Sequence, residues 1–475
     1  MEDSFKLKIA KGFLSLTFRK AVLLAINYFT INIILARVLP VSTIGVFNIA
    51  SSILAFFAFF SDIGLAASLI QKKEISIEDI KTTFTVQTIL AFLISLIVFF
   101  VAPYFASFYN LNFQGMWLIR ALAISFFLVS LKVVPSVLLE RELKFQPLVA
   151  IEILETFCFN LILIFLVFAN YSIAAFSFAV LARSISGVVL IYTLAPWKVS
   201  LGFSKLSIKA LLAFGLPFQI NSLLALLKDR LVPLVIARMV GSVGVGLITW
   251  SQSLAFLPLE VMNIMTRVTF PAFSRLSDNK KNLQETLEDS LFATGVILYP
   301  MLFGLNAIAP SLIAHVVSAK WQAAEPLIHL FSIGAFWATL SSPFTNLLNA
   351  IGKVKTTLKL MVMWTVLEWL LTPILTLYFG FLGAGIASAI ISVTSIIPLL
   401  IIKRMIKIEV VKNIWQPILA SIIMASFAYF LSRYFVSSFL SLLVLVLISG
   451  IFYSCLILFL ANKRIIKYYQ SFKNG

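Results

Sequence analysis

Hydrophobic residues run along this chain in long continuous stretches that are separated by short polar segments. Each stretch is roughly 20 residues long, the length that a helix needs to cross a hydrocarbon core of about 30 Å. The pattern predicts an all-α polytopic membrane protein with about fourteen transmembrane helices and no separate soluble domain. The expected cores are residues 13–38, 43–66, 83–103, 114–139, 148–169, 171–195, 210–238, 244–270, 290–316, 325–350, 358–379, 381–402, 414–434 and 438–461.

Composition supports this interpretation. Hydrophobic residues make up 61% of the 475 residues and charged residues only 12%, with a mean hydropathy of +1.04, too apolar for a soluble protein of this length. Cys158 and Cys455 both lie in apolar runs, which favours neither a disulfide framework nor a metal site. The first run is long, carries Arg19 and Lys20 and lacks a small-residue cleavage pattern, so we expect it to remain as the first helix.

The net charge of +18 reflects membrane topology, and we expect no nucleic-acid partner. Every second loop is basic, as is each end of the chain, whereas the opposite loops carry few cations. Basic loops face the cytoplasm. Both termini are therefore expected in the cytoplasm, which requires an even number of spans. The cations that mark this side include Lys6, Lys8, Lys11, Lys72, Lys73, Arg141, Lys144, Lys205, Lys209, Lys280, Lys281, Lys353, Lys355, Lys403, Arg404 and Lys467.

An internal repeat becomes visible when the chain is aligned with itself at an offset of 201 residues. The segment from Ala36 to Ile53 then matches the segment from Ala237 to Leu254. Each copy contains the end of one span, a tight loop and the start of the next, and six spans separate the copies. This arrangement predicts parallel repeats: a lobe at 1–200, a second lobe at 201–404, and two extra helices with a tail at 405–475. The identical pairs are Ala36/Ala237, Arg37/Arg238, Gly45/Gly246 and Ser52/Ser253.

Three motifs resemble those of the polysaccharide transporter family, the lipid-linked oligosaccharide flippases of the multidrug/oligosaccharidyl-lipid/polysaccharide exporter superfamily. The first is Arg37-Val-Leu-Pro-Val-Ser-Thr-Ile-Gly45-Val-Phe47, and the second is FSDIGLAASLIQKKEIS, residues 60–76. The third is Asp229-Arg230 followed by apolar residues up to Arg238, then Gly241 and Gly246. Pro40 stands where the family usually has Gly, and Ile248 where it usually has Phe or Tyr.

The resemblance implies two pseudo-symmetric six-helix lobes around a V-shaped central cavity that opens alternately to each side. It implies movement of undecaprenyl-diphosphate-linked oligosaccharides, including O-antigen and exopolysaccharide repeat units, from the cytoplasmic to the outer leaflet of the bacterial inner membrane. Membrane lipid, a polysaccharide polymerase and a chain-length regulator are then the expected partners.

Cations inside spans are the candidate substrate ligands. A charge near the bilayer centre costs about 2.5–3.5 kcal/mol on insertion scales, so these residues must face a partner or a wet cavity. Arg and Lys both suit a diphosphate. We expect diphosphate binding by Arg230, Lys228, Lys132, Arg183, Arg267 and Arg19, with an intramembrane ion pair as the structural alternative for each. Arg120 is a further cation within a span.

Acidic and polar residues in spans complete the candidate site. Ion coupling or ion pairing is expected of Asp229, Glu260, Asp62, Glu152, Glu155 and Glu368. Glu152 and Glu155 share a helix face and either complement Arg183 or carry a coupling proton, and Glu260 shares a face with Arg267. Glycan contacts are expected of Asn27, Asn32, Asn48, Asn221, Gln252 and Asn263, with helix-to-helix hydrogen bonding as the alternative, above all for Ser51, Ser52 and Ser253.

The chain lacks a phosphate-binding Gly-rich loop with Lys-Ser/Thr, so we expect no ATPase, no enzyme activity and no cofactor. Coupling, if any, would come from an H⁺ or Na⁺ gradient or from the membrane potential. His315 and His329 each stand alone near span ends and are expected to be interfacial. Two other classes remain: a drug or ion antiporter of the same superfamily, which the excess of cations disfavours, and a membrane-embedded polysaccharide polymerase or glycosyltransferase.

Overall fold

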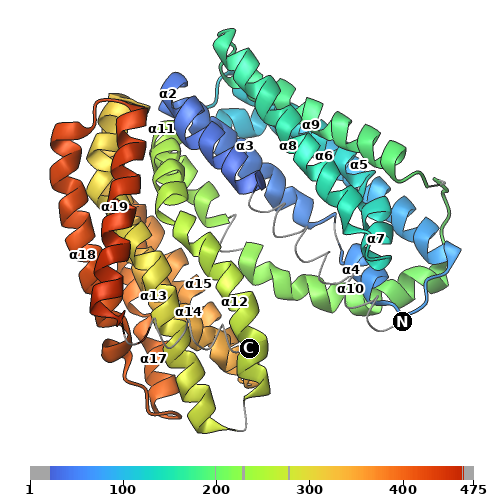
Figure 1. The fold of residues 1–475 in the computed structure, drawn as a ribbon. Helices are drawn as coiled ribbons and strands as arrows, with labels where there is room; N and C mark the ends of the chain where they lie inside the picture. The colour runs from blue at the N-terminus through green and yellow to red at the C-terminus, as the bar shows by residue number, and fades with distance from the viewer. Residues whose placement is uncertain are drawn as a thin grey trace. The chain divides into compact units, whose positions relative to one another are not determined.

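The computed structural model describes residues 22–61, 63–197, 199–226, 231–276, 279–462 and 464, without the side chains of residues 217, 218 and 220–225. Every secondary-structure element among the described residues is a helix (Figure 1). Within the described part of the chain, twelve helical segments are long and apolar enough to cross a membrane. The expected spans at 13–38 and 210–238 both contain residues outside the described part, so the total of fourteen stays a prediction.

The chain divides into two compact units, residues 1–246 and 247–475. The helices of the first unit are η1 (Thr30–Leu35), α2 (Ala36–Val38), α3 (Val41–Phe59), α4 (Leu65–Gln71), α5 (Ile77–Phe108), α6 (Phe113–Ser130), α7 (Val133–Arg141), α8 (Phe145–Phe168), α9 (Ile173–Leu194) and α10 (Lys205–Leu226). The division falls inside α11 (Val232–Ala255). It does not coincide with the expected lobe boundary after residue 200, which stays a prediction.

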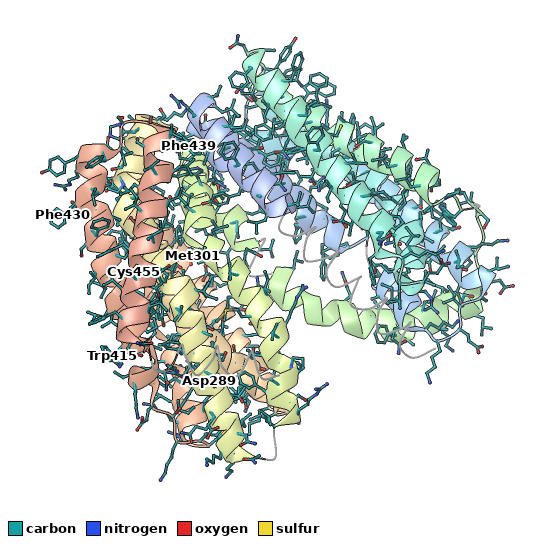
Figure 2. The ribbon with its side chains drawn as sticks, viewed as in Figure 1. Asp289, Met301, Trp415, Phe430, Phe439 and Cys455 are labelled. Carbon is teal, nitrogen blue, oxygen red and sulfur yellow. The ribbon has the colours of Figure 1, made fainter. Side chains whose placement is uncertain are left out.

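The helices of the second unit are α12 (Leu257–Arg275), α13 (Lys280–Ser311), η3 (Leu312–Val317), η4 (Ala319–Ala324), α14 (Glu325–Ala350), α15 (Val354–Phe379), α16 (Leu382–Val393), α17 (Ile396–Lys403), α18 (Val410–Phe435) and α19 (Phe439–Leu460). α13 packs against α14 and α18, and α18 packs against α19. Large apolar side chains cover the outside of this unit, as Phe430 and Trp415 on α18 illustrate (Figure 2). An apolar exterior of this kind is what a lipid environment favours.

Turn residues keep neighbouring spans apart as the sequence predicted. Asn170, with φ of 66°, follows α8, and Gly380, with φ of 58°, follows α15. Asn and Gly tolerate this left-handed conformation, which ends a helix and reverses the chain. Both pairs of adjoining spans are therefore separate helices, ending at Phe168 and Phe379.

Several expected spans contain breaks in their helices that the sequence prediction did not include, although Phe113–Arg141 and Leu382–Lys403 are each long and apolar enough to cross a membrane. The span at 43–66 ends at Phe59, and α4 starts separately after Gly64, whose φ is 80°. The span at 114–139 breaks at Leu131 and Lys132, the span at 244–270 between α11 and α12, and the span at 381–402 between α16 and α17. Gly241, with φ of 67°, also divides α11 into two helices. Hydropathy detects none of these breaks because each interruption is too short to lower the average over a span.

The second sequence motif contains α4 and the loop that follows it, and Arg141 holds this loop in place by hydrogen bonds. The Arg141 guanidinium donates hydrogen bonds to the backbone carbonyl oxygens of Ile70 and Lys73 at 3.0 Å each, and also to those of Leu69 and Lys72. These carbonyls lie at the C-terminal end of α4, where a cation is favourable. Asp79 then forms a capping box with Ser76 at the start of α5 and a 2.6 Å ion pair with Lys72.

Candidate functional site

The candidate site starts at the break in the fourth expected span. Lys132 lies between α6 and α7, as the residue before the first residue of α7. Pro135 lacks the N–H that would bond the carbonyl of Leu131, four residues earlier, and the Tyr192 hydroxyl donates to that carbonyl instead, at 3.0 Å. Interrupted helices of this kind occur in membranes where protein or a water-filled cavity satisfies the freed backbone groups.

Lys132 and Glu155 form an ion pair, with Nζ of Lys132 on Oε1 of Glu155. Glu155 lies on α8 and is only 3% exposed, whereas Lys132 is half-buried. A carboxylate this deeply buried needs a cation because the loss of its hydration is costly. The alternative predicted for Lys132, an intramembrane ion pair, is therefore present in this structure, and Glu155 pairs with Lys132 rather than with Arg183.

Gly187 on α9 makes the space for the Glu155 carboxylate. A β-carbon added at Gly187 would overlap Oε1 and Cδ of Glu155. The two helices lie side by side along their length. Glycine is thus required here for space, and the carboxylate occupies the slot that the missing side chain leaves.

Arg183 lies one helical turn before Gly187 on the same helix, and its guanidinium lies 5.9 Å from the centre of the Phe159 ring. Phe159 in turn lies one turn after Glu155 on α8. The two levels, Glu155 with Gly187 and Phe159 with Arg183, are therefore separated by about 5.4 Å along the two helices. Arg183 is exposed and forms no ion pair with any described residue. Among the described residues it is thus a cation without a carboxylate partner, one turn from a cation that has one.

Asn160 is a site residue that sequence reasoning missed. Its Nδ2 donates to Oδ1 of Asn27 at 3.0 Å and to the Thr156 carbonyl at 2.7 Å. Its own Oδ1 is buried and has no hydrogen-bond partner in the described part of the chain. An Asn within an apolar run was the available signal. The bond to Asn27, an expected glycan ligand, joins α8 to the apolar helix Val22–Val38.

The other polar residues predicted for the site in the first unit differ in their hydrogen-bond partners and in their burial. Asn48 Nδ2 donates to the Ile44 carbonyl of its own helix at 2.8 Å, as the helix-bonding alternative predicts. Asn32 is buried, and Glu152, Ser51 and Ser52 are half-buried. Arg120 is structural: its Nε donates to the Phe99 carbonyl, which Pro103 leaves without a partner, and its guanidinium packs on Phe99 and Trp117.

In the remaining part of the chain the candidates are dispersed. On α12, Arg267 and Asn263 are exposed and Glu260 is half-buried, and Arg267 forms no ion pair with any described residue, Glu260 included. Glu368 is half-buried on α15 and Gln252 on α11, while Ser253 donates to the Trp250 carbonyl of its own helix. Outside the described residues lie Arg19, Asp62, Lys228, Asp229 and Arg230, as does the side chain of Asn221.

Comparison with known proteins places the chain in a family. Residues 34–326 match the family described as "Polysaccharide biosynthesis protein". The chain belongs to this polysaccharide biosynthesis family. It is similar to the lipopolysaccharide biosynthesis protein WzxC of Escherichia coli K12, with 27% identity over 335 residues that cover 69% of this chain and 67% of WzxC.

Solved structures show the fold to which this family member belongs. The lipid II flippase MurJ in an inward closed conformation superposes with a TM-score of 0.74 at 14% identity, covering 96% of this chain and all of that one. An inward-facing multidrug resistance transporter of the MATE family and MOP superfamily gives 0.60 at 14% identity, over 85% of this chain and 98% of that one. The family resemblance and the all-helical fold class predicted from the sequence are confirmed.

Proposed function

We propose that this polysaccharide biosynthesis protein is a flippase that moves undecaprenyl-diphosphate-linked oligosaccharide repeat units from the cytoplasmic to the outer leaflet. The export of a surface polysaccharide would depend on it, with polymerase and chain-length regulator acting downstream. WzxC is named for lipopolysaccharide biosynthesis and MurJ for flipping lipid II, and both descriptions concern lipid-linked glycans or their products. The proposed location is the bacterial inner membrane, with both termini in the cytoplasm.

The observation that carries this proposal is a pair of cations, Lys132 and Arg183, at adjacent turns of the packed helices α8 and α9: Lys132 pairs with Glu155 of α8, and Arg183 lies one turn away on α9. Arg183 is exposed and has no carboxylate partner among the described residues, so it is available to a phosphate. Lys132 stands one turn away and is held by Glu155. Two phosphates joined by one bridging oxygen have charges a few ångströms apart, which matches cations on adjacent turns. Bidentate Arg–phosphate contact and a mobile Lys charge suit these roles.

Glu155 stabilises the site when no substrate is bound. While no substrate is bound, its carboxylate neutralises Lys132 inside the membrane, where an unpaired charge is costly. An arriving diphosphate competes for the same ammonium group. The exchange proceeds without a bond being broken in the substrate.

The test measures translocation of a lipid-linked oligosaccharide in proteoliposomes. Arg183→Gln is expected to lower the rate at least tenfold, which corresponds to about 1.4 kcal/mol of lost stabilisation. Lys132→Gln alone would leave Glu155 unpaired, so the informative variant is the neutral pair Lys132→Gln with Glu155→Gln, which keeps size and hydrogen bonding. The matched control is Arg433→Gln, which removes an exposed cation that packs on Tyr429 in α18. Full activity in both site variants would refute the diphosphate role.

A further inference from the structure

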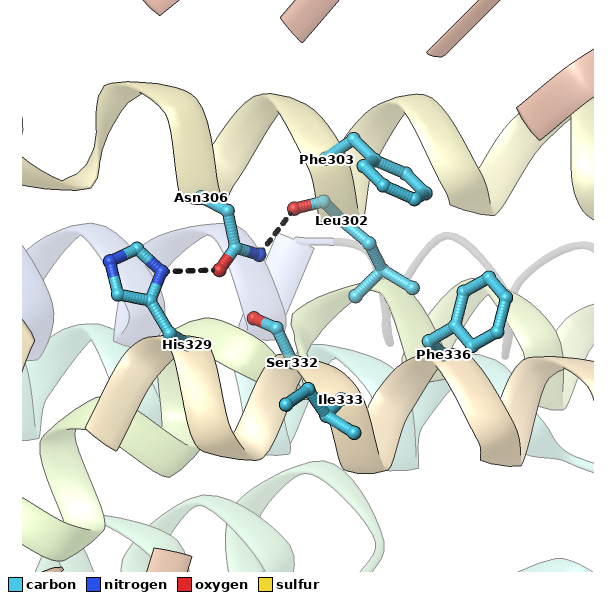
Figure 3. A pocket seen from close by; sticks show the side chains of 7 residues that line it. All are labelled: Leu302, Phe303, Asn306, His329, Ser332, Ile333 and Phe336. Atoms are coloured by element: carbon cyan, nitrogen blue, oxygen red, sulfur yellow. Dashed lines mark hydrogen bonds between the residues drawn. The ribbon is translucent and has the colours of Figure 1, made fainter. Parts of the chain in front are cut away.

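A pocket of about 330 Å³ lies between α13 and α14. One wall is formed by Leu302, Phe303 and Asn306 of α13, and the other by His329, Ser332, Ile333 and Phe336 of α14 (Figure 3). The residues on α14 follow helical spacing, so they share one face. The pocket is therefore a slot between two packed helices, with apolar side chains along most of its length and three polar side chains in one part.

The polar part has a defined arrangement of donors and acceptors. Asn306 Nδ2 donates to the Leu302 carbonyl at 2.7 Å, which leaves Oδ1 as the acceptor for Nδ1 of His329 at 2.6 Å. Nδ1 of His329 is therefore the donor of this bond, and Nε2 is an acceptor in the tautomer that carries its proton on Nδ1 alone. Nε2 lies 3.9 Å from Oε1 of Glu325, too far for a hydrogen bond. In this tautomer, Nε2 offers its lone pair to a ligand.

Ser332 provides the second observation. Its side chain is 6% exposed, and its hydroxyl has no hydrogen-bond partner among the described residues. Figure 3 shows this hydroxyl directed towards the side of the pocket where Asn306 and His329 lie. A buried hydroxyl without a partner costs free energy. A ligand that bonds it recovers that cost.

We propose that this pocket binds a hydroxyl-bearing lipid, with one hydrocarbon chain along Leu302, Phe303, Ile333 and Phe336. The lipid hydroxyl donates to Nε2 of His329 and accepts from Ser332. The apolar walls and the membrane-spanning position of both helices favour a lipid over a water-soluble ligand. The Glu325 carboxylate beside Nε2 disfavours an anionic phosphate at this end, which selects an uncharged head group. The proposal is independent of the proposed function, because occupancy is measured without transport.

The experiment uses photo-crosslinking of the full chain in nanodiscs, with mapping of labelled peptides by mass spectrometry. Three probes carry a diazirine in the chain: a diacylglycerol, a polyprenol and a polyprenyl monophosphate. We expect the two hydroxyl probes to label residues 302–306 and 329–336 at least fivefold more than the phosphate probe does. The stronger of the two hydroxyl probes identifies the source as a glycerol lipid or a free prenol.

Two variants and one control complete the test. Ile333→Trp fills the pocket from an exposed position and should reduce labelling at least fivefold, whereas Ser332→Ala removes only the hydroxyl and should reduce it about threefold. Ile374→Trp changes a similarly exposed residue on α15 that does not line the pocket, and should leave labelling unchanged. Stronger labelling by the phosphate probe, or equal labelling in Ile333→Trp and Ile374→Trp, would overturn the proposal.

Discussion

At the scale of single residues, the site depends on one glycine. Gly187 has no side chain, and the Glu155 carboxylate fills the space that a β-carbon would need. The depth of this carboxylate fixes where Lys132 must lie, since a buried charge keeps its partner close. A neutral residue thereby determines the position of a cation on a different helix.

Gly187→Ala is the first prediction at this scale. The added methyl group should force Glu155 out of its slot and lower the free energy of unfolding by about 1–3 kcal/mol, the usual cost of overpacking. The thermal transition of the detergent-solubilised protein measures it. Glu155→Asp, one methylene shorter, should restore part of the loss in the double variant. Gly450→Ala is the matched control, because nothing lies within 4 Å of its added β-carbon. Equal effects at positions 187 and 450 would contradict the argument.

The sequence identifies the charged residues but not their pairing. Spacing placed Glu152 and Glu155 on one face of α8, yet it could not show that Glu155 meets Lys132, since the two come from helices whose rotation depends on packing. Asn160 and Asn48 both lie in apolar runs, and only the structure shows that one reaches another helix while the other bonds its own. Hydropathy predicted the spans well because membrane thickness fixes their length.

At the scale of elements, three helical prolines share one structural solution. Each proline leaves the carbonyl four residues earlier without its helical donor. Arg120 donates to Phe99, opposite Pro103; Tyr192 donates to Leu131, opposite Pro135; and Tyr453 donates to Val296 at 2.9 Å, opposite Pro300. Each donor comes from a neighbouring helix. Each proline thus leaves a carbonyl on its helix that a side chain of a neighbouring helix can bond. The position of the proline in the sequence predicts which carbonyl this is, but not which side chain donates to it.

Tyr192→Phe tests this relation. Losing the hydroxyl leaves the Leu131 carbonyl without its partner, so we expect a destabilisation of about 1–3 kcal/mol. Pro135→Ala returns an N–H at the position that bonds this carbonyl in a helix. In a double-mutant cycle, Tyr192→Phe should therefore cost clearly less in the Pro135→Ala background. Unfolding measured by denaturant or heat in one detergent gives all four values. Additive effects would show that the hydroxyl and the proline are unrelated.

At the scale of the whole molecule, the internal repeat has a physical counterpart. A β-carbon at Gly45 would overlap the Ser242 carbonyl, and one at Gly246 would overlap the Val41 carbonyl. The offset of 201 residues converts Val41 to position 242 and Gly45 to position 246, so each contact is the image of the other. Such reciprocal contacts are what a two-fold relation produces. The glycine shared by both repeats allows the two backbones to approach closely.

The repeat also constrains topology, because copies related by an axis along the membrane normal enter the membrane from the same side. The basic loops predict that Lys205 precedes the second copy on the inner side and that Ser437, between α18 and α19, lies in an outer loop. Alkaline phosphatase fused after Ser437 should be active and a fusion after Lys205 inactive, with green fluorescent protein fusions giving the reverse. Fusions at Gly380, between α15 and α16, should behave like Ser437, which tests the same side at a second loop. An active phosphatase at Lys205 would invert the orientation, and an active one at both Lys205 and Ser437 would require a different number of spans between them.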